Sequence, residues 1–101
     1  MSFALIVRFE IAEVHRAAFL AAVQANAAQS VADEPGCLRF DVLAPLERDG
    51  TEVLLYEIYA DRAALDHHLT TGHYQSFDAT TRSMIGSKSV TFLALTENAK
   101  T

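Results

Sequence analysis

Hydrophobic and polar positions along the chain follow two periods, and each period predicts a kind of element. Segments rich in β-branched and aromatic residues favour strands, and there are four of them, at 3–11, 37–43, 52–60 and 87–95. The alanine-rich residues 14–32 predict a helix. The Glu-Pro-Gly sequence at 34–36 is expected to end it.

The residues between the third and fourth predicted strands indicate two further helical pieces. Asp61 can cap a helix that begins at Arg62 and runs to about Thr71, because its carboxylate can accept a hydrogen bond from a free backbone N–H. Gly72 suits a left-handed position at the end of that helix. The second piece follows over about residues 73–85.

The order of these elements is β-α-β-β-α-β, with residues 37–60 forming a hairpin. This order is the split arrangement of ferredoxin-like folds. We therefore predict a single α+β domain over residues 1–101, built on an antiparallel sheet.

Both faces of the predicted sheet are largely apolar. In the first strand Leu5 and Val7 point to one face, whereas Ala4 and Ile6 point to the other. The helices of this fold can cover only one face, and a chain of 101 residues benefits from sharing apolar surface with a second copy. We therefore expect a homodimer in which two sheets pack face to face.

Charge and composition exclude several classes of partner. The net charge of −5, without a basic cluster, disfavours a nucleic-acid surface. No apolar run approaches the ~20 residues of a membrane span, and the first residues lack the pattern of a signal peptide. Cys37 is the only cysteine, which excludes an internal disulfide and favours a reducing, cytoplasmic location.

Two polar residues follow an apolar stripe in the first predicted helix. Phe19, Val23, Asn26 and Ser30 recur at helical spacing and therefore share one face. Asn26 and Ser30 are thus expected to point toward the interior.

Two histidines fall on similar stripes in the later helices. His68 shares a stripe with Leu65 and Leu69, and His73 shares one with Phe77. A single inward histidine is more often a hydrogen-bonded core residue than a catalyst. Two of them together with Asn26 favour a functional pocket, since each unpartnered buried polar group costs ~1–3 kcal/mol. His15 and His67 are expected to face solvent.

A metal site is the main alternative for these histidines. His68 and His73 lack the i, i+4 spacing of a helical pair of ligands, and no carboxylate within the motif completes a triad. We therefore predict no metal. The chain also lacks a glycine-rich phosphate loop and a G-x-S-x-G elbow, and Cys37 is expected to be buried and inert.

A second polar set lies on the predicted hairpin. If Leu43 pairs with Val53, Arg39 lies opposite Glu57 and the two form a cross-strand ion pair. The pair would be purely structural, or it would hold an arginine ready for an anionic group. Alternatively, the carboxylate would orient a histidine.

The sequences "EPGCLRFDVL" and "LYEIYADRAALDHHLTTGHYQSF", with the element order, resemble the antibiotic biosynthesis monooxygenase family, of the dimeric α+β barrel type. The resemblance covers about residues 3–95. Within the family, "LRFDVL", "YEIYAD" and "TTGHY" with Asn26 look most like the quinol monooxygenases and a related isomerase. The family has a proline where this chain has Gly72, which can change how His73 is aimed. The haem-degrading branch relies on a tryptophan, and this chain has none.

The resemblance implies oxygenation without flavin, metal or haem. A phenolic substrate is deprotonated, its anion passes one electron to O₂, and the radicals recombine to a peroxide that collapses to a quinone and water. The protein supplies a base, hydrogen bonds and a dry cavity. His68 is the favoured base, because burial keeps an imidazole neutral. The other candidate site residues are His73 as ligand or alternate base, Asn26 as a catalytic group, and Tyr56, Arg39, Glu57, Ser30 and Phe77 for substrate binding.

Two other functions stay open at this point. In the isomerase of a phosphorylated diketone-type molecule, a histidine would move a proton beside a carbonyl, and an arginine would hold the phosphate. The acidic net charge disfavours an anionic substrate, although Arg39 or Arg8 could outweigh it. The third function is a non-enzymatic binding or stress-response module. The sequence does not name the substrate.

Overall fold

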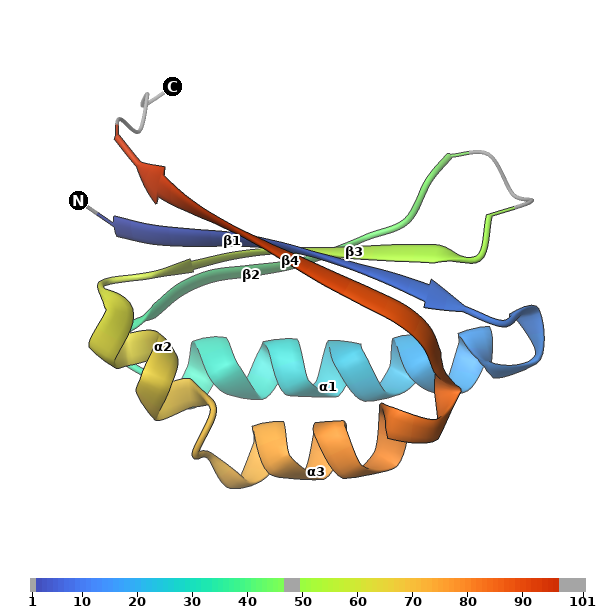
Figure 1. Cartoon of the computed structure of the whole chain (residues 1–101). Helices are drawn as coiled ribbons and strands as arrows, with labels where there is room; N and C mark the ends of the chain where they lie inside the picture. Colours follow the sequence, from blue (N-terminus) through green and yellow to red (C-terminus); the bar gives the residue numbers. More distant parts are fainter. Residues whose placement is uncertain (1, 47–49, 97–101) are drawn as a thin grey trace.

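A four-stranded antiparallel sheet carries three α-helices on one of its faces (Figure 1). The computed structural model describes residues 2–46 and 50–96. In chain order the elements are β1 (Ser2–Ile11), η1 (Glu13–His15), α1 (Arg16–Asp33), β2 (Cys37–Leu43), β3 (Glu52–Tyr59), α2 (Arg62–His68), α3 (Gly72–Thr81), η2 (Arg82–Met84) and β4 (Ile85–Leu95). Both the predicted α+β class and the β-α-β-β-α-β order are confirmed.

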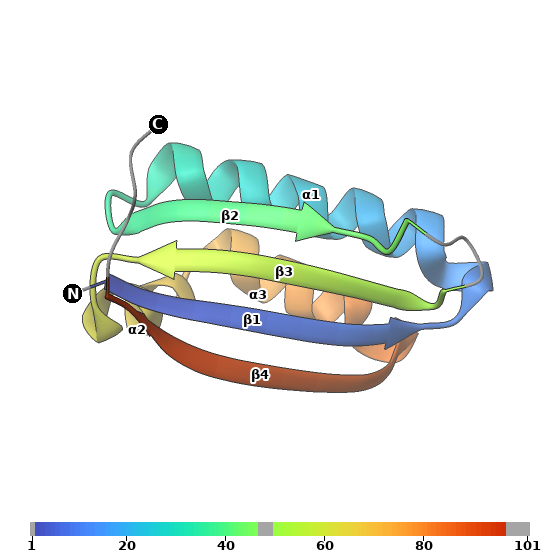
Figure 2. The ribbon, with the colours of Figure 1, turned by 90° about the horizontal axis from the view of Figure 1, so that it is seen from above.

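The strands lie in the order β2-β3-β1-β4, as the view onto the sheet shows (Figure 2). Helix α1 runs along the β2 side and α3 lies nearer the middle, so β4 forms an edge that the helices leave largely uncovered. On β4 the side chains of Val90 and Phe92 are 38% and 52% exposed. This open edge gives the helix-facing side of the sheet access to solvent.

The helix-facing side of the sheet holds the core. Leu5, Val7 and Phe9 of β1 alternate with residues that point the other way, and all three are buried against Phe19 and Val23 of α1. The period-2 and period-3.6 stripes meet here, as the sequence pattern predicts.

The starts of the two later helices are fixed by side-chain caps. The Asp61 carboxylate accepts a hydrogen bond from the Ala64 backbone N–H at 2.8 Å, which confirms the predicted cap of α2. The prediction for Gly72 was wrong. Helix α2 ends at His68, Thr71 caps the next helix, and Gly72 is the first residue of α3. No residue in the described ranges has a positive φ, so Gly72 has no left-handed role.

The predicted cross-strand pair of Arg39 with Glu57 was also wrong. From Leu43 to Arg39 the pairing is one residue off the assumed register, so that Leu43 lies opposite Leu54. Arg39 therefore lies opposite Ile58 and pairs with Asp41 at 2.6 Å. Glu57 lies opposite Phe40 and points toward the helices.

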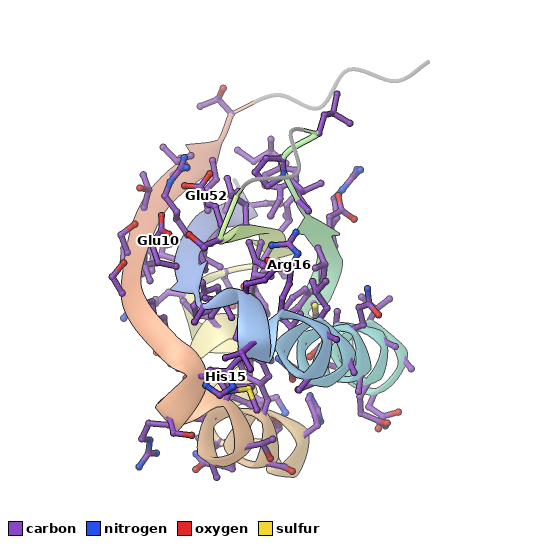
Figure 3. The ribbon with its side chains drawn as sticks, turned by 90° about the vertical axis from the view of Figure 1, so that its right-hand side faces the viewer. Glu10, His15, Arg16 and Glu52 are labelled. Atoms are coloured by element: carbon purple, nitrogen blue, oxygen red, sulfur yellow. The ribbon has the colours of Figure 1, made fainter. Side chains whose placement is uncertain are left out.

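Polar side chains gather at the end of the sheet where β1 leads into α1. Glu10 and Glu52 are register partners on the uncovered side, whereas His15 lies on the side of the helices (Figure 3). Arg16 donates a hydrogen bond to the Gly50 carbonyl at 3.2 Å, tying α1 to the start of β3. His15 is half-buried rather than solvent-facing as expected, while His67 is exposed as predicted.

The described part of the chain contains no helix whose length and hydropathy would let it cross a membrane. This finding agrees with the absence of long apolar runs in the sequence.

Candidate active site

One buried carboxylate joins the two inward histidines. Glu34 Oε2 accepts hydrogen bonds from His68 Nδ1 at 2.8 Å and from His73 Nε2 at 2.5 Å. The Glu34 and His68 side chains are each 3% exposed, and the His73 side chain is 17% exposed. We call Glu34, His68 and His73 the carboxylate–histidine cluster.

Three elements bring these side chains together. Glu34 directly follows α1 and caps its C-terminal end, His68 is the last residue of α2, and His73 is the second residue of α3. Thr71 fixes the joint between the two histidines, because its hydroxyl donates to the His68 carbonyl at 2.7 Å and accepts from the Tyr74 N–H at 3.2 Å. The two histidines, five residues apart in the sequence, are thereby placed so that both contact the Glu34 carboxylate.

The hydrogen bonds decide the charges in this cluster. Burial alone would raise the pKa of Glu34, but the hydrogen bonds that His68 and His73 donate lower this pKa below its usual value. Burial lowers the pKa of His68, with Glu34 acting in the opposite direction. At neutral pH Glu34 is therefore ionised and His68 is neutral.

An ionised carboxylate can only accept hydrogen bonds, so the proton of neutral His68 must be on Nδ1. The other ring nitrogen, Nε2, then carries a lone pair. This nitrogen has no hydrogen-bond partner among the residues that the structure describes, and the His68 side chain lines a cavity that is open toward the β4 edge. The arrangement therefore leaves His68 able to accept a proton from a molecule in that cavity.

The cavity lies between the helices and the helix-facing side of the sheet. Its volume is about 240 Å³, and most of its wall is apolar, including Leu5, Val7, Leu55 and Leu65. Asn26, Glu57 and Phe77, which the sequence singled out, line it together with His68. Pockets for drug-sized ligands span ~300–1,000 Å³, so this cavity suits a smaller molecule.

A second buried carboxylate, Glu57, lines the cavity itself and is in a different protonation state from Glu34. The Tyr59 hydroxyl donates to Glu57 Oε1 at 2.7 Å. Burial raises the pKa of Glu57 to about 7, because this single hydrogen bond and the charge of Lys88 only partly offset the loss of water. Glu57 is consequently a group that changes its charge near neutral pH.

The remaining predicted residues lie outside the cavity wall. Ser30 is buried behind it and donates to the Asn26 carbonyl at 2.7 Å, with its hydroxyl 3.5 Å from His68 Nδ1. Arg39 and Tyr56 lie on the uncovered side of the sheet, where the guanidinium stands 5.7 Å from the centre of the tyrosine ring. The structure therefore does not bring Arg39 or Tyr56 to the cavity.

His73 opens onto a different space from His68. It lines a groove of about 360 Å³ between α1 and α3, together with Ala22, Ala25 and Gln29. Asn26 and Phe77 line both spaces, so they form part of the wall between the groove and the cavity.

Sequence reasoning missed Glu34, which it treated only as part of a helix stop. The signal was present, because Glu34 follows Ser30 by four residues and so continues the stripe of Val23, Asn26 and Ser30. Glu34 also supplies the carboxylate that the stretch containing His68 and His73 itself lacks. The ligand atoms of Glu34, His68 and His73 all lie within 4.8 Å of one another.

Cys37 takes no part in the cluster. It is buried, as predicted, and burial raises the pKa of its thiol to about 11. Since the thiolate is the reactive form, this cysteine is inert at neutral pH.

Comparison with known proteins gives one family. The family profile described as "Antibiotic biosynthesis monooxygenase" matches residues 2–80. A search among curated proteins gave no match.

Solved structures share the fold over nearly the whole chain. Rv0793 from Mycobacterium tuberculosis is 31% identical, with a TM-score of 0.87 and coverage of 99% of this chain and 100% of that one. The structure "Putative antibiotic biosynthesis monooxygenase from Nitrosomonas europaea" is 27% identical, with a TM-score of 0.88 and coverage of 94% and 99%. A Caulobacter crescentus protein of the same description is 24% identical, has a TM-score of 0.88 with coverage of 95% and 91%, and supports the fold alone.

Proposed function

The chain belongs to the antibiotic biosynthesis monooxygenase family, and we propose that it is a cofactor-independent monooxygenase that oxidises a small aromatic quinol with O₂. The observation that carries this proposal is the state of His68. This buried histidine is neutral, is held by ionised Glu34, and lines an apolar cavity of suitable size.

The first step is deprotonation of the quinol. His68 Nε2 accepts the proton of a phenolic hydroxyl, and Glu34 stabilises the imidazolium that forms through its hydrogen bond to Nδ1. Asn26 lines the same cavity as His68, and its side-chain amide can donate a hydrogen bond to a substrate oxygen. The apolar walls exclude water, which strengthens both interactions.

Oxygen then reacts with the bound anion. The quinolate transfers one electron to O₂, and the resulting substrate radical and superoxide combine at a ring carbon to form a C–O bond. His68 returns its proton to the distal oxygen of this peroxide. Loss of the proton from the same ring carbon breaks the O–O bond, so that one oxygen stays as a carbonyl and the other leaves as water. A hydroquinone and O₂ thus yield a hydroxyquinone and water.

The isomerase alternative is less well supported by the geometry. The two arginines considered as phosphate ligands, Arg8 and Arg39, both lie on the uncovered side of the sheet and pair with Glu52 and Asp41. Neither lines the cavity that contains His68; the cationic side chains that do line it are Arg62, which pairs with Asp66, and Lys88. The acidic net charge points the same way.

Oxygen uptake with a panel of hydroquinones and naphthohydroquinones tests the oxygenase directly. We expect uptake above the uncatalysed rate, without added metal or flavin. His68→Ala should lower kcat/KM by about 10²–10⁴-fold, the usual contribution of a general base, while His67→Ala, at the exposed neighbour, should leave it unchanged. A His68→Ala variant that is folded and turns over substrate at the parent rate would show that His68 is a packing residue.

We further propose that the protein is a homodimer formed through the uncovered side of the sheet. All three α-helices lie on the other side (Figure 1). The uncovered side carries Leu43 and Leu93, which are 48% and 45% exposed, around the half-buried Leu54 and Tyr56. Light scattering at micromolar concentration should give twice the chain mass of 11.1 kDa, and Leu93→Glu should shift it toward one chain.

A further inference from the structure

We propose that Glu34, His68 and His73 form a binding site for a first-row divalent metal ion of the Zn²⁺ class, reached through the groove between α1 and α3. The site would use the same carboxylate–histidine cluster that orients the base. Metal binding itself does not depend on the proposed oxygenase activity.

The donor set matches the chemistry of such an ion. Two imidazole nitrogens and one carboxylate are ligands that zinc accepts in proteins. With bonds of about 2.0–2.2 Å, ligand atoms around a tetrahedral ion stand about 3.4 Å apart. Here Oε2 of Glu34 lies 2.8 Å from His68 Nδ1 and 2.5 Å from His73 Nε2, and all three ligand atoms lie within 4.8 Å of one another. Small side-chain movements would therefore create the coordination geometry.

A second observation points to a cation at this place. Oε1 of Glu34 is buried and has no hydrogen-bond partner among the described residues. An ionised carboxylate oxygen without a partner is costly in the interior. A divalent ion beside Glu34 would satisfy this oxygen, either by bidentate coordination or through the ion's charge.

The groove gives an ion direct access to His73. His73 lines the groove of about 360 Å³ and is the most exposed member of the cluster. An ion could enter beside this imidazole, while water in the groove would fill the coordination positions that the three side chains leave open. The small side chains of Ala22 and Ala25 keep the entrance wide.

Occupancy would have a defined effect on the base, and this consequence rests on the proposed function. A metal on Nδ1 of His68 replaces the proton there, so the neutral ring must carry its proton on Nε2. His68 would then present a donor to the cavity instead of an acceptor. Zinc is therefore expected to inhibit an enzyme that needs no metal for its chemistry.

The test measures Zn²⁺ binding to the tag-free full chain in the absence of substrate, by calorimetry and by competition with a chromophoric chelator. We expect one Zn²⁺ per chain and a rise in Tm on binding. His73→Ala and Glu34→Gln should each weaken the affinity at least tenfold, since even outer partners of metal ligands contribute about 10–100-fold. His67→Ala is the matched control, because His67 is exposed and lies one residue from a ligand.

Circular dichroism must first show that each variant is folded. His73→Ala is the safest of them, because this side chain is only partly buried. Co²⁺ provides a spectroscopic check, since tetrahedral nitrogen and oxygen ligation gives visible d–d bands that His73→Ala should abolish and His67→Ala should keep. Wild-type protein that binds no Zn²⁺ stoichiometrically, or whose binding is the same in folded His73→Ala, would overturn the proposal. Because no substrate is present, neither outcome bears on quinol oxidation.

Discussion

Glu34 and Glu57 are two buried carboxylates in opposite states. Glu34 is 4% exposed and Glu57 is 5% exposed, so both are shielded from bulk water, although Glu57 lies deeper in the protein. Two imidazoles donate to Glu34, and its pKa falls below the usual value. One phenol donates to Glu57, and its pKa rises to about 7. The deeper burial of Glu57, together with two donors on Glu34 against one on Glu57, decides which carboxylate is ionised at neutral pH.

Because of this difference, the two carboxylates can have different roles in the site. An ionised Glu34 fixes the tautomer of His68 and can stabilise an imidazolium. Glu57, which faces the same cavity, can exist as a carboxylic acid and donate a hydrogen bond to a substrate oxygen. Two identical side chains thereby supply a constant negative charge in one place and a titrating group in another.

The largest expected effect on stability comes from removing Glu34, the carboxylate that is ionised. Glu34→Ala leaves both imidazoles without their shared acceptor, and each hydrogen bond to a charged group contributes ~1.5–3 kcal/mol. We expect a loss of about 3–5 kcal/mol in the free energy of unfolding at pH 7, measured by urea denaturation. A loss below ~1 kcal/mol would mean that the cluster does not hold α1 to the joint of α2 and α3.

Glu57→Gln should have the opposite effect and increase the stability of the protein at high pH. The pKa of Glu57 is raised in the folded protein, so its charge destabilises the fold as pH rises from the usual value of 4.5 through about 7. Above pH 7 the substitution should therefore stabilise the protein, by on the order of 1–3 kcal/mol. The gain should become small near pH 4.5, where the carboxyl is protonated in the folded state and half protonated in the unfolded state.

Thermal unfolding from pH 4.5 to pH 8 measures this difference. Glu13→Gln, at an exposed position, controls for the general loss of one negative charge. A Glu57→Gln variant that is less stable than the parent at pH 8 would indicate that Glu57 is ionised and well solvated in the folded protein.

The smallest expected effect is a change in the pKa of Glu57 when its hydrogen-bond donor is removed. The Tyr59 hydroxyl lowers the pKa of Glu57 by donating to Oε1. Tyr59→Phe should therefore raise the pKa of Glu57 further, by roughly one unit, since one hydrogen bond contributes ~0.5–1.5 kcal/mol. Carbon-13 NMR titration of the glutamate carboxyl groups measures the change. An unchanged or lower pKa would contradict the role given to Tyr59.

The same comparison shows what could be predicted from the sequence. His68 lies inside a regular apolar stripe, so its burial followed from spacing alone. Glu34 continues the stripe of Asn26 and Ser30 but lies one residue beyond the end of α1, so spacing indicated its direction and not its partners. Its contact with the histidines depends on how α2 and α3 pack against α1, which a local pattern does not contain.

The hairpin illustrates the same limit in the strands. The boundaries of β2 agree with the prediction. However, the register from Leu43 to Arg39 is one residue off the assumed one, which changed the partners of Arg39 and Glu57, and register depends on the turn as well as on the residue pattern. Glu57 and Tyr59 are two residues apart on one strand, so their shared face was predictable. The hydrogen bond between them forms because both side chains are buried together, and the strand pattern does not give that depth of burial.

The central claim is that ionised Glu34 holds His68 as a neutral imidazole with its proton on Nδ1. Nitrogen-15 NMR of the metal-free protein at pH 7 tests this directly, because protonated and unprotonated ring nitrogens have well-separated chemical shifts. The account predicts a protonated Nδ1 and a bare Nε2 for His68, and loss of this preference in Glu34→Gln. A proton on Nε2 alone, or on both nitrogens, would contradict it.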